Sequence, residues 1–335
     1  MSTIDVAALS SEISAESPCG ENLEYDPAFG EMERAAQGKP EQEMGSTVVA
    51  AEEPDWKDLK SKSLAVLTRS RDLRAATYLV RALVHTDGLS GFADGLDLLR
   101  ALLERHWEHV HPGLDPDDDN DPTMRINAIV TLVDQDTTIR DIKATPLVRA
   151  RGLGQYSLRD IEIALGETQH EAGSQPVEMS VIDATFQDAD LEELKATAEA
   201  VSRASETFAS IDAFLVATAG TMHAPNLSAL PPVLARIQSV LGEHLSRRGV
   251  VDAALVGTAA AQAPPPATGE INSREDVIRA LDKICEYFSR HEPSSPVPLL
   301  AKRAKRLVSK SFLEILRDMA PGGIHEAESI RGPEE

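Results

Sequence analysis

The stretch RDLRAATYLVRALVHTDGLSGFADGLDLLRALLERHWEHV, residues 71–110, decides the fold class of this chain. Leucine, valine and alanine recur at the spacing of one helical face, first from Leu73 to His85 and again from Leu89 to Val110. Gly88 lies between the two runs and predicts a helix end. Two helices joined by so short a connection are expected to pack as antiparallel neighbours in a bundle.

The same spacing continues upstream of this stretch. Asp55 stands where its side chain can cap a helix, whereas residues 38–54 contain glycine, proline and glutamate and predict a loop. The buried face of the helix that follows is expected to consist of Trp56, Leu59, Ser63, Val66 and Leu67.

Downstream, three local signals add further elements. Asp121 is expected to cap a helix that begins at Pro122, and the run from Pro146 to Tyr156 predicts one short β-hairpin. Ser157 and Asp160 have the spacing of a capping box that opens another helix. The first of these helices is expected to turn inward Ile126, Ile129, Val130 and Val133.

Changes in composition divide the chain further. Residues 167–179 are polar, and two long helical patterns follow at 191–219 and 227–247, each about 30–40 Å long at 1.5 Å per residue. Residues 257–272 are rich in alanine and proline, which is typical of a linker. We therefore expect an all-α protein with a helical bundle domain at 1–172, an elongated helical domain at 180–256, a linker at 257–272, a C-terminal helical domain at 273–323 and a disordered tail at 324–335.

Charge and cysteine content narrow the classes of function. The net charge of −22 argues against general binding of nucleic acid or anionic membranes, which requires a basic surface. Cys19 and Cys285 are too few for a disulfide framework. The chain shows neither a signal-peptide pattern nor an apolar run of membrane-spanning length, so we expect a cytoplasmic protein without direct membrane insertion.

The C-terminal segment 273–323 differs from the rest in charge. It holds two helical patterns on either side of the elbow 292–300, and its basic residues outnumber its acidic ones. A helical unit of about fifty residues is marginal alone, so we expect it to assemble with copies of itself. The expected self-interface consists of Val277, Leu281, Ile284, Phe288, Val297, Leu300 and Leu307, and the expected partner-docking face of Lys302, Arg303, Lys305 and Arg306.

Acidic and histidine residues at 106–121 raise the question of a metal site. Asp115, Asp117, Asp119 and Asp121 follow the start of an EF-hand pattern, but Asn120 and Ile126 occupy positions that need glycine and glutamate. We therefore expect Asp115 or Asp118 to pair with Arg125 in a helix-capping loop. A metal-dependent hydrolase that uses His106, His111 and Asp115 is the alternative from another class; otherwise no catalytic residue, metal or cofactor is expected.

Several spaced motifs carry a family resemblance. They are Pro18-Cys19-Gly20-Glu21 with Leu23, Tyr25 and Asp26; Pro54-Asp55-Trp56; Ser70-Arg71-Asp72-Leu73-Arg74; Gly88-Leu89 with Gly91-Phe92 and Gly95-Leu96; and His111-Pro112 with Leu114, Asp115, Asp118, Asp121-Pro122, Arg125 and Asn127. In this order they resemble the ImpA N-terminal domain, which marks the TssA family of the bacterial type VI secretion system, over about residues 14–166. Residues 273–315 are similar to the short C-terminal domain of one TssA branch.

The resemblance implies a non-enzymatic scaffold of the secretion apparatus at the inner membrane of a Gram-negative bacterium. Members of this branch resemble ring-forming homo-oligomers that contact baseplate proteins, the Hcp tube, the VgrG spike and the TssB–TssC sheath. A role in sheath capping or at the membrane complex is the alternative within the family. The expected structural motif residues of the N-terminal domain are Trp56, Arg74, Trp107, His111, Asp115, Asp118, Asp121 and Arg125.

Overall fold

The computed structural model describes residues 2–38, 42–44, 47–49, 53–115, 119–168, 177–219 and 225–250, and single helical positions between 281 and 305. The chain divides into two compact units, Met1–Ala261 and Gln262–Glu335. In the first unit the elements are α1 (Val6–Leu9), α2 (Pro27–Gln37), β1 (Gln42–Met44), β2 (Thr47–Val49), α3 (Trp56–Leu67), α4 (Leu73–His106), α5 (Thr123–Val130), a 3-10 turn η1 (Thr131–Val133), a π-turn η2 (Gln135–Ile139), α6 (Arg140–Ala144), β3 (Pro146–Ala150), β4 (Gly154–Ser157), α7 (Leu158–Ala164), α8 (Met179–Asp188), α9 (Leu191–Ala219) and α10 (Leu230–Arg247).

Element α4 lies at the centre of the first unit and is a helical hairpin. Gly88 breaks the helix with φ 65° and ψ −148°, and the arms on either side, 73–87 and 89–106, fold back on each other. The arms touch at Gly95, where an added Cβ would lie 2.8 Å from Val80 Cγ2, so this close approach requires glycine. The two antiparallel helices expected on either side of Gly88 are therefore confirmed.

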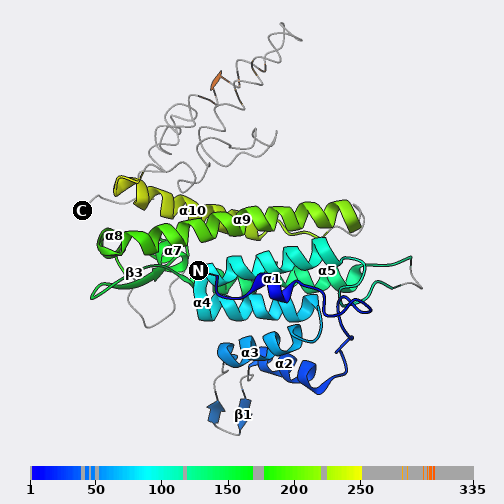
Figure 1. The fold of residues 1–335 in the computed structure, drawn as a ribbon. Helices are drawn as coiled ribbons and strands as arrows, with labels where there is room; N and C mark the ends of the chain where they lie inside the picture. Colours follow the sequence, from blue (N-terminus) through cyan, green and yellow to red (C-terminus); the bar gives the residue numbers. More distant parts are fainter. Residues whose placement is uncertain are drawn as a thin grey trace. The chain divides into compact units, whose positions relative to one another are not determined.

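Helices cover this hairpin in layers (Figure 1). On one side α3 packs on α4 and α2 packs on α3, whereas on the other side α9 packs on α4 and α10 packs on α9. Both arms of α4 are thus enclosed, which explains why nearly all of its apolar side chains are buried. Burial of such side chains is the main favourable term in the stability of the unit.

The predicted capping signals agree with the structure at two helix starts. The Asp55 carboxylate accepts hydrogen bonds from Lys57 N and Asp58 N at the start of α3. Ser157 and Asp160 form the expected capping box at the start of α7. The expected hairpin is also confirmed, because β3 and β4 pair in antiparallel register with Arg149 opposite Gln155.

Three expectations need correction. Helix α5 begins at Thr123, one residue after the predicted start, and Val130 on it is exposed rather than turned inward. Residues 42–44 and 47–49 pair as two short strands inside the predicted loop; Thr47, Val48 and Val49 are β-branched residues that favour strands. Helix α8 begins at Met179, the last residue of the polar boundary 167–179, and was not predicted.

The long helical patterns are close to the prediction. Helix α9 has the expected bounds, whereas α10 begins at Leu230, three residues later than expected, with prolines in its first turn. Because α9 packs on α4, residues on both sides of 167–179 belong to one compact unit. The division at 167–179 into independently folding domains stays a prediction.

Few residues of the second unit are described. Leu281, Val297, Leu300, Lys302, Arg303 and Lys305 are helical, and Leu300 is 67% exposed. Val277, Ile284, Phe288, Arg306 and Leu307 of the expected interfaces lie outside the described residues, as does Asp118. The self-interface and the docking face of the C-terminal segment therefore stay predictions.

Candidate functional site

Arg71 joins the N-terminal segment to the start of α4. Its side chain is 3% exposed, and its guanidinium donates hydrogen bonds to the carbonyl oxygens of Ser11 (2.8 Å), Ala8 (3.1 Å) and Leu67. Its backbone N–H donates to the Cys19 carbonyl at 2.7 Å. A single arginine thus supplies the donors that this irregular segment needs when it is buried.

Arg125 plays the same part at the end of α4. Its side chain is fully buried, and it donates to the carbonyl oxygens of Pro112 (2.7 Å), Val110 (2.7 Å) and Trp107. Burial lowers the pKa of Arg125 to about 10, so the guanidinium stays protonated at neutral pH. Nε, Nη1 and Nη2 of Arg125 each donate to a backbone carbonyl. Asp118 lies outside the described residues, so the expected pairing of Arg125 with Asp115 or Asp118 stays a prediction.

The two histidines of the alternative hydrolase site also contact backbone carbonyls. His106 Nε2 lies 2.9 Å from the Ser10 carbonyl oxygen, and His111 Nε2 lies 3.1 Å from that of Gly20. Since a carbonyl only accepts, each Nε2 carries a hydrogen and has no lone pair for a metal. Asp115 N donates to the Asp121 carbonyl at 3.3 Å. Within the described ranges, histidine, cysteine and acidic side chains form no group of three that could hold a metal ion.

Trp56 and Trp107, both expected motif residues, also pack within the fold. Trp56 stacks on His85 with ring centroids 3.7 Å apart, and Trp107 makes an edge contact with Phe214 of α9 at 5.5 Å. The guanidinium of Arg125 lies over the Trp107 ring at 4.9 Å.

Arg74 and Cys19, two further motif residues, also have structural roles. Arg74 pairs with Asp72 at 2.8 Å and Glu24 at 3.3 Å, and lies over the Phe29 ring. Burial raises the pKa of the Cys19 thiol to about 11, which keeps it protonated and unreactive. The motif residues placed by the structure therefore hold the fold together.

A buried carboxylate that sequence reasoning missed ties α4 to α9. Asp94 is 1% exposed and accepts hydrogen bonds from Thr3 N, Thr3 Oγ1 (2.9 Å) and Arg203 Nη2 (2.7 Å). Burial alone would raise the pKa of Asp94, but the bonds from Thr3 and Arg203 hold it below its ordinary value. In the sequence, this buried site is marked only by an aspartate within the apolar pattern of the second arm of α4, residues 89–106.

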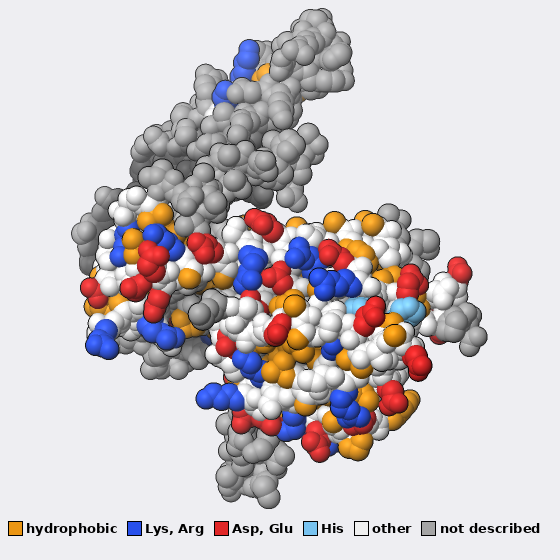
Figure 2. Space-filling view, in the orientation of Figure 1, with side chains coloured by type: hydrophobic (Ala, Val, Ile, Leu, Met, Phe, Trp, Pro, Cys, Tyr) orange, Lys and Arg blue, Asp and Glu red, His pale blue; other side chains and the backbone are white. Residues whose placement is uncertain are grey.

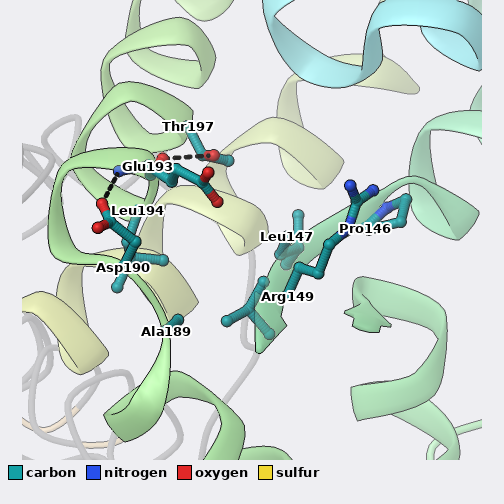
Figure 3. Close-up of a pocket in the computed structure, with 9 residues that line it drawn as sticks. Pro146, Leu147, Arg149, Ala189, Asp190, Glu193, Leu194 and Thr197 are labelled. Carbon is teal, nitrogen blue, oxygen red and sulfur yellow. Dashed lines mark hydrogen bonds between the residues drawn. The ribbon is translucent and has the colours of Figure 1, made fainter. Parts of the chain in front are cut away.

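A pocket of about 140 Å³ lies between β3 and the first turns of α9 (Figure 3). Its floor is apolar and its rim is charged: Arg149 projects from β3 on one wall and Glu193 from α9 on the other. The lining residues are Pro146, Leu147, Val148, Arg149, Ala189, Asp190, Glu193, Leu194 and Thr197. No sequence signal marks this pocket, because its two walls are at least forty positions apart in the chain.

The surface around the described elements carries both signs of charge. Figure 2 shows basic and acidic side chains interspersed over one face of the first unit, despite the net charge of −22. In the part of the chain that the structure describes, no helix combines the length and apolar character needed to cross a membrane.

Comparisons with known proteins agree with these motifs. Residues 10–134 match the family model described as ImpA, N-terminal, type VI secretion system. The chain is 43% identical over 345 residues to the type VI secretion system component TssA1 of Pseudomonas aeruginosa, with 99% of each chain covered. Its fold is similar, with a TM-score of 0.60 and 21% identity, to a solved N-terminal domain that includes the conserved ImpA_N region of the TssA component from Burkholderia cenocepacia, over 73% of this chain and 95% of that one.

Proposed function

Because this chain belongs to the TssA family of type VI secretion system components, we propose that it is a non-enzymatic scaffold that helps to assemble the contractile tail. The observation that carries this proposal is the similarity to TssA1, which extends over 99% of the chain and so includes the C-terminal segment.

The use of the polar motif residues supports a scaffold rather than an enzyme. Arg71 and Arg125 use their guanidinium nitrogens, and His106 and His111 use Nε2, on backbone carbonyls. An enzyme needs polar groups that are free to meet a substrate, whereas these residues rigidify the corners between helices.

The proposed mechanism is multivalent. The C-terminal segment 273–323 assembles copies of the chain into a ring, and each copy presents its first unit to a repeated partner in the baseplate, the tube or the sheath. Weak contacts then add through effective concentration, so the assembled ring binds more tightly than one copy does. Lys302, Arg303, Lys305 and Arg306 form the proposed docking face on the basic segment.

Electron microscopy and light scattering of the full chain test the ring. We expect large particles for the unsubstituted chain and much smaller ones for Leu300→Asp, which places a charge in the proposed self-interface. Leu165→Asp is the matched control, because Leu165 is also an exposed leucine, at 49%, but lies in the first unit. A monomeric full chain, or particles that Leu300→Asp leaves unchanged, would refute the ring.

A further inference from the structure

Two opposite charges without partners flank the pocket between β3 and α9. Both Arg149 and Glu193 are exposed, and among the residues that the structure describes neither side chain has an ion-pair partner. They do not pair with each other because they stand on opposite walls of the pocket (Figure 3). By contrast, the three arginines of α9 and α10 are all paired: Arg203 with Asp94, Arg236 with Glu167 and Arg247 with Asp183.

The strand that carries Arg149 is unusual in this acidic chain. The sixteen residues 144–159 contain three arginines and no acidic residue, whereas acidic residues make up 55 of 335 positions overall. Leu147 and Val148 beside Arg149 are 2% and 4% exposed, so the core fixes the strand while the guanidinium points to solvent. An arginine held on a rigid base loses little freedom on binding, as interface hot spots require.

The opposite wall is built to receive a cation. Asp190 Oδ1 accepts from the backbone N–H groups of Glu192 (2.9 Å) and Glu193 (3.0 Å), which fixes the first turn of α9. Thr197 Oγ1 donates to the Glu193 carbonyl at 2.9 Å in the next turn. Below these carboxylates, Ala189 and Leu194 give an apolar floor on which the methylene stem of an arginine can lie.

We propose that a second copy of this chain occupies the pocket, with Arg149 of each copy inserted between β3 and α9 of the other. Arg149 stands on the rim of the pocket itself, and Glu193 on the opposite rim carries the complementary charge. A two-fold axis at the rim therefore brings Arg149 of each copy to Glu193 of the other, as a self-complementary interface requires. This contact lies in the first unit and does not depend on the proposed ring at 273–323.

A charge swap in the full chain tests this contact. Sedimentation velocity over a concentration series is measured for the full chain with Leu300→Asp, and again without that change. We expect a reversible dimer in the Leu300→Asp chain. Arg149→Glu or Glu193→Arg is expected to weaken the dimer about tenfold per contact, and hence about a hundredfold for the symmetric pair. The double variant Arg149→Glu with Glu193→Arg is expected to restore the dimer.

Arg151→Glu is the matched control, since it makes the same charge change at an exposed arginine of the same hairpin outside the pocket. The proposal is overturned if the Leu300→Asp chain is monomeric at every concentration, if Arg151→Glu weakens the dimer equally, or if the double variant does not recover. It is also overturned if Glu193→Arg alters binding to another protein but leaves self-association unchanged. The change in particle size caused by Leu300→Asp alone tests the ring. The ring and the Arg149 contact can therefore fail independently of each other.

Discussion

Arg125 and Arg149 lie twenty-four positions apart in the sequence and serve opposite purposes. Arg125 is fully buried and donates hydrogen bonds to three backbone carbonyls. Arg149 is exposed at the rim of the pocket and has no ion-pair partner among the described residues. The first belongs to a family motif and the second does not. The motif arginine thus fastens a corner between helices, whereas the arginine outside the motifs remains exposed.

The largest expected effect comes from removing the buried arginine. Arg125→Met leaves the carbonyls of Trp107, Val110 and Pro112 without donors, and we expect a loss of about 3 kcal/mol in the free energy of unfolding. Urea denaturation of the full chain, followed by circular dichroism, measures it. The matched control Arg149→Met should change the unfolding midpoint little; equal losses at the two positions would contradict the distinction between them.

A smaller loss is expected for the buried carboxylate that joins α4 and α9. Asp94→Asn keeps the shape of the side chain but removes the charge that faces Arg203, at an expected cost of about 2 kcal/mol. Because the pKa of Asp94 is lowered in the folded protein, its stabilisation is full above about pH 4 and is lost as the pH falls further. The stability difference between the two proteins should therefore shrink in acid. A constant difference between pH 7 and pH 3 would contradict this account.

His244 extends the comparison to a buried ring of which only one nitrogen has a neighbour, because Nε2 lies 3.8 Å from Asp183 Oδ1. It stacks on Phe186 at 3.8 Å, and within the described structure its Nδ1 is buried without a hydrogen bond. Burial, aided by Arg247, lowers the pKa of His244 below its ordinary 6.5.

The unfolded chain thus binds a proton that the folded chain does not, and stability falls as the pH drops below about 6.5. His244→Phe should remove up to about 1.4 kcal/mol per pH unit of that fall. Thermal unfolding at pH 7.5 and 5.5 measures it, and an unchanged pH slope in His244→Phe would refute the assignment.

The smallest effect on stability is expected at the pocket rim. Glu193→Gln, like Arg149→Met, should change the free energy of unfolding by less than about 0.5 kcal/mol, since exposed charges without partners contribute little. Thermal unfolding is measured at low protein concentration, so that self-association does not contribute to the change in the free energy of unfolding. A loss above about 1 kcal/mol would mean that these side chains support the fold itself.

The sequence was most informative where a signal is local. Gly88, the Asp55 cap and the Ser157–Asp160 box each act within a few residues, and each predicted feature is present. The bounds of α9 followed from its periodicity alone.

Features built from distant residues were not predictable in this way. Asp94 and Arg203 are 109 positions apart, and the pocket joins residues 146–149 to 189–197. The contacts of Arg125 with backbone carbonyls have the same origin. Nearby aspartates suggested a salt bridge, whereas burial of a turn without regular structure required donors for its carbonyls.

The reversal at Gly88 also has a kinetic consequence. It brings Val80 against Gly95 across only fifteen residues, so the central hairpin closes a short loop and is expected to form early during folding. The docking of α9 must instead close a loop of about a hundred residues, which costs more chain entropy and comes later. During synthesis the α4 hairpin can therefore be complete before α9 leaves the ribosome, and its uncovered side would be the surface that chaperones meet first.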